Sequence, residues 1–187
     1  GTTRIRVGIA DVDVCAARGT AIDRHAATET TTVYAGIAVF PMLPEALSTD
    51  ATSLNERGDR AALVTEFVVG ADGRVTEGRV YRALVCNHAR LTYDAVGAWL
   101  EGRGDAPAPI ATSAALAEQL HAQDAAAQRL RAERYRHGAL NVDTIETRPV
   151  ISHGEITSVD KQAKNRATEL IEDFMIAANE VVARTLA

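Results

Sequence analysis

Apolar and polar residues follow two periods along this chain, and these periods predict both strands and helices. Alternating or β-branched apolar runs predict strands at 4–14, 31–40, 61–69, 74–85, 147–152 and 155–159, and the first of these should be buried. Apolar residues at helical spacing predict helices at 19–30, 92–101, 110–137 and 164–186, and Pro44 favours a short helix at 44–47. The Gly- and Pro-containing stretch 102–109 is read as a loop within one fold rather than as a domain boundary.

Two pairs of these strands should form hairpins. Asp72 and Gly73 lie between the runs 61–69 and 74–85, and Asp-Gly in that position is a good hairpin signal. The runs 147–152 and 155–159 should turn at His153 and Gly154. In the first hairpin we expect one face to carry Thr65, Phe67 and Val69, and the other to carry Val64, Glu66 and Val68. This hairpin should have a structural role and carry no chemistry.

The two long helices should expose charged residues. The helix 164–186 should turn inward Leu170, Phe174, Ala177, Ala178, Val181 and Val182, with Glu169, Glu172, Asp173 and Glu180 on its other faces. The helix 110–137 ends in an arginine cluster before Gly138, which should terminate it. One interpretation is a solvated helix end that suits the helix dipole. The other is that Arg131 and Arg134 contact nucleic-acid phosphates.

Composition narrows the class of protein. The 187 residues suffice for one domain with a core, and aromatic residues make up only 4% of them, so aliphatic side chains must fill it. The net charge of −5 argues against indiscriminate nucleic-acid binding but allows a narrow channel with local positive charge. No apolar run has the length of a membrane span. Cys15 and Cys86 are expected to be buried free thiols, which suits a reducing cytoplasm.

Asp11 and Asp13 at the end of the first strand suggest a metal site. The alternative is that they cap the following turn. No pattern for a P-loop, a dinucleotide-binding turn, a zinc protease or a serine hydrolase occurs in the chain.

The chain resembles the RNB domain of the ribonuclease II and ribonuclease R exoribonucleases. The central match is Tyr34, a short apolar run and PMLPE at 41–45, followed by SLN at 53–55. Further blocks occur in family order, so the resemblance covers nearly the whole chain. They are VGIADV, RGTAIDRHA, DRAALVTEFVVGADGRV, YRALVCNHARLTYDAV, HGALNVDT and NRATELIEDFMIAANEVVA.

The resemblance implies an α+β fold in which a mixed, mainly antiparallel sheet packs against helices. It also implies 3′→5′ hydrolysis of single-stranded RNA to nucleoside 5′-monophosphates, with Mg²⁺ held by an aspartate cluster of the form D-x5-D-x-DD-A. That motif does not occur in residues 1–187. We therefore expect a partial RNB catalytic domain with no catalytic residue and no metal ligand of its own. The Mg²⁺ ligands, the downstream half and an S1-type domain would lie elsewhere, in the remainder of the same enzyme.

Three RNA contacts are implied by matching positions. Tyr34 falls on the family's aromatic residue that packs against the 3′-terminal nucleotides, although a tyrosine packed in the core is the alternative. Tyr93 and Glu172 fall on positions linked to the choice of RNA over DNA. Tyr93 could instead anchor its helix, and Glu172 could be a solvated carboxylate. Val142 departs from the pattern, because ribonuclease II has an aromatic residue there that clamps RNA from the opposite side.

Two functions from different classes follow. The first is a cytoplasmic exoribonuclease to which this chain supplies scaffold and RNA-contacting residues. The second is a non-catalytic RNA-binding or assembly module that kept the scaffold and lost the aspartates.

Overall fold

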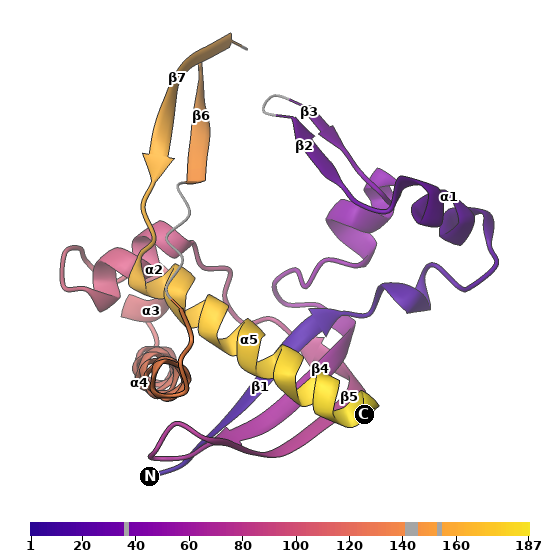
Figure 1. The fold of residues 1–187 in the computed structure, drawn as a ribbon. Helices are drawn as coiled ribbons and strands as arrows, with labels where there is room; N and C mark the ends of the chain where they lie inside the picture. Colours follow the sequence, from indigo (N-terminus) through magenta and orange to yellow (C-terminus); the bar gives the residue numbers. More distant parts are fainter. Residues whose placement is uncertain (36–37, 141–145, 153–154) are drawn as a thin grey trace.

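The computed structural model describes residues 1–35, 38–140, 146–152 and 155–187, and it combines antiparallel sheets with packed helices (Figure 1). The expected α+β class is therefore confirmed. The predicted turn at His153 and Gly154, and the position of Val142, lie outside the described residues. No helix in the described ranges combines the length and apolar character that a bilayer crossing requires.

The largest sheet has three strands in the order β1-β4-β5, all antiparallel: β1 (Thr3–Ala10), β4 (Asp59–Val69) and β5 (Val75–Cys86). The hairpin predicted around Asp72 and Gly73 is confirmed as β4 and β5. Gly73 has a positive φ of 85°, which glycine adopts without strain. The Asp72 carboxylate accepts a hydrogen bond from the amide of Arg74 at 3.1 Å, so the local sequence accounts for the turn.

The first strand is shorter and more exposed than predicted. It ends at Ala10, and Val12–Val14 form a single 3₁₀ turn in place of the strand expected there. Only Ile5 is fully buried, because β1 lies at the edge of the sheet and pairs with β4. The prediction of a buried strand over 4–14 was therefore wrong, since an apolar run can also belong to an edge strand with one covered face.

One face of this sheet is covered by two helices, α4 (Ala114–Arg136) and α5 (Arg166–Leu186), as Figure 1 shows. Phe67 and Val69 of β4, which were predicted to share a face, pack there against Leu130 of α4 and Phe174 of α5. The inward face of α5 is confirmed for Leu170, Phe174, Ala177, Ala178 and Val181. Asp173 contradicts the prediction of an outer face, because it too is buried.

The region predicted as one helix over 110–137 is two helices. The short α3 (Ala108–Ala111) ends at Thr112, and Ser113 begins α4 by accepting a hydrogen bond from the amide of Leu116 at 3.3 Å. The break has a local cause, since serine is a preferred N-cap residue. Gly138 follows α4 with φ of 86°, as expected for a residue just past a helix end.

A second apolar cluster joins α2 (Tyr93–Leu100) to α3, α4 and α5. Gly97 lies against the N-terminus of α5: a Cβ atom there would come within 2.6 Å of the Asn165 side-chain oxygen. The same oxygen accepts hydrogen bonds from the amides of Ala167 and Thr168, both at 3.0 Å. The small residue thus allows α2 to approach the capped end of α5 closely.

Two hairpins project from this body (Figure 1). The predicted strand 31–40 is in fact a pair, β2 (Val33–Ala35) and β3 (Ala38–Phe40), with Tyr34 opposite Val39. The second hairpin, β6 (Glu146–Ser152) and β7 (Glu155–Gln162), is confirmed. The predicted helix over 19–30 is α1 (Ala21–Glu29), and a π-helical turn, η2 (Leu47–Ala51), follows the expected short helix.

Both cysteines are free, as expected, but both are exposed rather than buried. Cys86 ends the edge strand β5, and Cys15 follows the 3₁₀ turn, so neither position lies beneath a helix. Their burial was predicted from the usual preference of cysteine for interiors, which position in the fold overrides here.

The turn at Gly73 provides a test of how closely α4 approaches the sheet. A Cβ atom at this position would overlap the carbonyl group of Arg129, whose carbon would lie 2.8 Å away. We expect Gly73→Ala to lower the free energy of unfolding by about 3 kcal/mol or more, because overlap adds to the cost of a positive φ. Urea denaturation followed by circular dichroism measures the change.

Gly138→Ala is the matched control, because Gly138 has nearly the same φ but no heavy atom within 4 Å of the added Cβ. It should cost only about 1 kcal/mol, from backbone strain alone. Equal losses in the two variants would show that the close contact between the turn and α4 is absent.

Candidate nucleic-acid interface

Tyr34 lies on the β2–β3 hairpin with its side chain 78% exposed. Its neighbours on the two strands, Val33, Val39 and Phe40, are also exposed large apolar residues. The alternative of a tyrosine packed in the core therefore does not apply to the described structure. The free ring has the surface that base stacking requires, and stacking itself stays a prediction.

A hydrogen bond closes the base of this hairpin. The Thr32 hydroxyl accepts a hydrogen bond from the amide of Met42 at 3.1 Å, directly after β3. Leu43, the next residue, is buried. An isolated two-stranded hairpin is only marginally stable in water, so the hydrogen bond between its two ends helps to stabilise the hairpin that carries Tyr34.

Tyr93 and Glu172 lie on two helices that pack together. Tyr93 begins α2 and is 50% exposed, and Glu172 lies on α5, near the helix end that contacts Gly97. The Glu172 carboxylate accepts a hydrogen bond from Lys164 Nζ at 2.9 Å, which lowers its pKa, so the carboxylate is charged at neutral pH. Its side chain remains 43% exposed and can accept further hydrogen bonds.

The structure does not gather all three predicted RNA contacts at one point. Tyr93 and Glu172 belong to the packed pair α2 and α5, whereas Tyr34 belongs to a hairpin that projects separately (Figure 1). A strand of several nucleotides could run from one part to the other.

Arg131 and Arg134 are tied to α5 rather than solvated. Arg131 Nε contacts one carboxylate oxygen of Asp173 at 3.1 Å, Arg134 contacts the other, and Arg131 also pairs with Glu169 at 2.7 Å. The interpretation of these two arginines as a solvated helix end was therefore wrong. A contact with RNA phosphates stays a prediction, and any such contact would have to share their donors with Asp173.

Asp173 itself is 1% exposed. Burial raises the pKa of its carboxyl group, while the neighbouring guanidinium groups of Arg131 and Arg134 oppose that shift. A buried carboxylate without such partners would cost several kcal/mol, so the arginines have a structural reason to be here.

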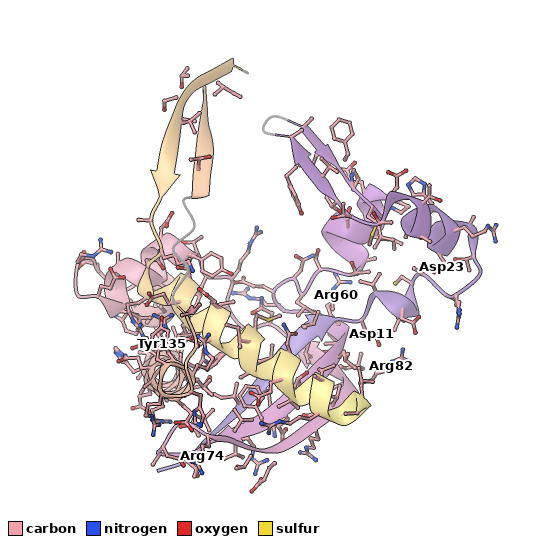
Figure 2. The ribbon with its side chains drawn as sticks, in the orientation of Figure 1. Asp11, Asp23, Arg60, Arg74, Arg82 and Tyr135 are labelled. Carbon is pink, nitrogen blue, oxygen red and sulfur yellow. The ribbon has the colours of Figure 1, made fainter. Side chains whose placement is uncertain are left out.

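Asp11 and Asp13 bind one arginine. Arg82 Nε lies 2.9 Å from Asp11, and Arg82 Nη2 lies 2.6 Å from Asp13; Figure 2 shows Asp11 and Arg82 close together beyond the end of β1. Asp11 makes no side-chain hydrogen bond to the turn that follows it, so the capping interpretation is wrong.

The metal interpretation is not supported either. Mg²⁺ requires several free oxygen ligands, and these two carboxylates are already paired with a guanidinium group. Within the described ranges, no three histidine, cysteine or acidic side chains come together as a metal site would need. These residues therefore do not fit a catalytic Mg²⁺.

A second charged cluster, around Glu66, was not predicted from the sequence. Its buried carboxylate accepts hydrogen bonds from Arg4, Arg6, Arg79 and the Tyr81 hydroxyl, at 2.6–3.1 Å. The arginine hydrogen bonds hold the pKa of Glu66 far below its usual range. The alternation of Arg4 and Arg6 along β1 was a signal that basic residues face one side of the sheet.

Comparison with known proteins identifies a family and relatives that this chain resembles. The model of the RNB domain matches residues 1–187. Ribonuclease R of Escherichia coli is 36% identical over 185 residues, which cover 98% of this chain and 22% of that protein. The chain thus spans about a fifth of the length of such relatives.

Solved structures show the same similarity. Mycoplasma genitalium RNase R, in complex with ribose-methylated single-stranded RNA, matches with a TM-score of 0.86 and 29% identity, over 98% of this chain and 28% of that one. A complex of the same protein with double-stranded RNA matches with a TM-score of 0.87. Yeast Ssd1, a pseudonuclease, has a TM-score of 0.71 and 16% identity over 98% of this chain and 22% of its own, so that likeness shows the fold alone.

The pairing of Arg134 with Asp173 leads to a test in the absence of RNA. Arg134→Ala should lower the free energy of unfolding by about 1–3 kcal/mol, because it leaves a buried carboxylate oxygen without its partner. Arg184→Ala, which removes an exposed pair with Glu180, should change it by less than about 0.5 kcal/mol. If both substitutions are neutral in urea denaturation, the Asp173 cluster does not stabilise the fold.

Proposed function

The chain belongs to the RNB domain family, and on that premise we propose that it supplies the scaffold and RNA-contacting surface of a 3′→5′ exoribonuclease. Its substrate is single-stranded RNA, and its products are nucleoside 5′-monophosphates. The observation that carries this proposal is the match of nearly the whole fold to an RNase R solved with RNA bound.

Metal binding and RNA binding are assigned to different parts of the enzyme. RNB nucleases depend on Mg²⁺, but the described carboxylates do not fit that ion, so its ligands are assigned to the remainder of the enzyme. This chain contributes no catalytic residue. It binds and orients the RNA, and the reaction takes place, on this account, in the cytoplasm.

Tyr34 provides binding that does not depend on base identity. Every base has a π face, so a tyrosine ring stacks on each, and a nuclease that degrades any sequence requires such tolerance. The exposure of the ring and the hydrogen bond that closes the base of its hairpin both suit this role.

Tyr93 and Glu172 provide selectivity for the sugar. The 2′-hydroxyl is the group that separates RNA from DNA, and a charged carboxylate is a strong acceptor for it. Glu172 is held ionised by Lys164 and remains partly exposed beside α2, on which Tyr93 lies.

A non-catalytic RNA-binding or assembly module is the second candidate. It is favoured by the absence of a carboxylate cluster among the described residues, and the same fold occurs in a protein described as a pseudonuclease. The coding sequence upstream of Gly1 distinguishes the two: a D-x5-D-x-DD motif there supports the enzyme, and a coding region without it supports the module.

The 187-residue chain alone should not hydrolyse RNA with Mg²⁺, because its described residues bring together no set of side chains that would hold the ion. The measurement is release of mononucleotides from an end-labelled oligoribonucleotide, with full-length E. coli ribonuclease R as positive control. Metal-dependent release by this chain would show that the active site has been misplaced, and Asp11 and Asp13 would then be the first residues to replace.

In the full-length protein, Tyr34→Ala should weaken binding of a short RNA by about 1–3 kcal/mol through lost stacking. Because the side chain is exposed, the melting temperature should stay unchanged. Val39→Ala, on the opposing strand, is the matched control and should keep the parent's affinity. An unchanged dissociation constant together with a lower melting temperature in Tyr34→Ala would assign the ring to packing instead.

Replacing Tyr93 with Phe, or Glu172 with Ala, should narrow the difference between RNA and DNA affinity, mainly by improving DNA binding. Once nucleic acid covers these side chains, an acceptor that DNA leaves unpaired costs about 1–3 kcal/mol, and each substitution removes part of that penalty. The comparison uses RNA and DNA oligomers of one sequence at one salt concentration, since phosphate contacts weaken both as salt rises. If both variants kept the parent's ratio of RNA affinity to DNA affinity, Tyr93 and Glu172 would not be the residues that select RNA.

A further inference from the structure

Two loops meet at one end of the paired strands β4 and β5. Residues 54–57 lead into β4, and residues 87–90 follow β5. Along the chain, the first loop comes from the β2–β3 hairpin through η2, and the second leads into α2 (Figure 1). This loop junction therefore connects the segment that carries Tyr34 with the helix that begins at Tyr93.

Hydrogen bonds hold the two loops of the junction together. The Asn87 carbonyl accepts a hydrogen bond from the amide of Arg57 at 2.9 Å, and the Asn87 side-chain amide donates one to the carbonyl of Leu54 at 3.0 Å. The Glu56 carboxylate accepts a hydrogen bond from the amide of Arg90. Each of the two arginines thus has its backbone bonded to the opposite loop.

The backbone of Arg57 is strained. Its φ is 60°, a left-handed value that a residue with a Cβ atom adopts at an energetic cost, whereas glycine adopts it freely. The hydrogen bond to Asn87 helps to hold this conformation. Strained backbone is frequent at binding sites, where the surrounding structure fixes the position of one side chain.

The guanidinium groups of Arg57 and Arg90 are available to a ligand. Both residues are exposed, and among the described residues neither side chain has an ion-pair or hydrogen-bond partner. Arg82 and Arg131, by contrast, are each paired with two carboxylates. The junction's own carboxylate, Glu56, is bonded to a backbone amide.

Phosphate is the group that this arrangement fits best. A guanidinium group is always charged at neutral pH, and its planar set of donors matches the oxygens of a phosphate. The chain as a whole has a net charge of −5, so RNA requires local positive charge along its path. A nucleic-acid strand that reaches from Tyr34 to Tyr93 has backbone phosphates between those two contacts.

We propose that Arg57 and Arg90 bind backbone phosphates of the RNA segment between the nucleotide at Tyr34 and the ribose at Tyr93 and Glu172. This role depends on the RNA binding proposed for the chain, and it adds a contact that reads neither base nor sugar. Because the hydrogen bonds of the junction hold the backbone of both arginines, the two charges keep the strand in register between its other contacts.

Arg57→Gly and Arg90→Gln in the full-length protein each remove one guanidinium group. Each should weaken binding of a short oligouridylate roughly threefold to tenfold, because a charged hydrogen bond to phosphate is lost. Binding is measured without Mg²⁺, so that the RNA stays intact. Glycine relieves the strain at position 57, so Arg57→Gly should keep or raise the melting temperature, whereas loss of a merely structural residue would lower it.

The salt dependence of binding identifies the lost contact as one to phosphate. For single-stranded nucleic acid, the slope of log affinity against log salt changes by about 0.7 for each phosphate contact. The slope should become shallower by about that amount in each variant and by about twice as much in the double variant. Arg18→Ala is the matched control, because Arg18 is also exposed and unpaired among the described residues but lies in the turn before α1. It should keep the parent's slope.

Oligouridylates with a single neutral methylphosphonate linkage locate the contacted phosphates. At a linkage that Arg57 or Arg90 binds, the neutral group should weaken binding to the parent but cause no further loss in the variant that lacks that arginine. These linkages should lie on the 5′ side of the nucleotides that lose affinity in Tyr34→Ala. Additive losses at every linkage would contradict the proposal.

The outcomes also separate this contact from the proposed function. If Tyr34→Ala weakens RNA binding but the arginine variants keep the parent's affinity and salt slope, the proposed function stands and the phosphate contact is overturned. That result would also be obtained if another part of the full-length protein occupied the two guanidinium groups. If the full-length parent binds no RNA, both the proposed function and this contact are wrong.

Discussion

The burial of one face of α5 holds the described structure together. That face packs simultaneously on the three-stranded sheet, on α4 and, through the contact of Gly97 with Asn165, on α2. Buried apolar area is the main favourable term, at roughly 25 cal/mol per Å². The same face carries Asp173, whose burial is tolerated because Arg131 and Arg134 reach it from α4. Apolar packing and ion pairing therefore both fix how α4 and α5 lie against each other, and α5 also carries Glu172.

Local signals in the sequence were sufficient to predict those elements whose structure is determined by nearby residues. Asp72 and Gly73 identified the β4–β5 turn, and the helical spacing of Leu170, Phe174 and Ala177 identified the buried face of α5. Asp173 and Glu66 could not be predicted in the same way. Their partners are tens of residues away in sequence, and the pattern around a buried charge looks like that around an exposed one. Whether such a charged residue is buried depends on ion pairs between distant parts of the chain, and no local periodicity in the sequence indicates those pairs.

The candidate site was found by resemblance rather than by periodicity. Nothing in the spacing of Tyr34, Tyr93 and Glu172 connects them, and the structure places the first on a separate hairpin. The strand 31–40 was predicted as one element because its apolar run gives no sign of reversal, although Tyr34 pairs with Val39 in the structure. That reversal exposes the ring. The Asp11 and Asp13 pair shows the opposite error, since two carboxylates separated by one residue suggested chemistry but proved to be partners of Arg82.

The central claim is that RNA lies across the β2–β3 hairpin and the α2–α5 pair. Photo-crosslinking with single-stranded RNA that carries 5-iodouridine at successive positions, read by mass spectrometry, tests it most directly. The account predicts adducts on Tyr34 from nucleotides near the 3′ end, and adducts within α2 or α5 near Tyr93 and Glu172 from other positions. Adducts confined to the sheet face that carries Arg6 and Arg79, with none on the hairpin, would contradict it.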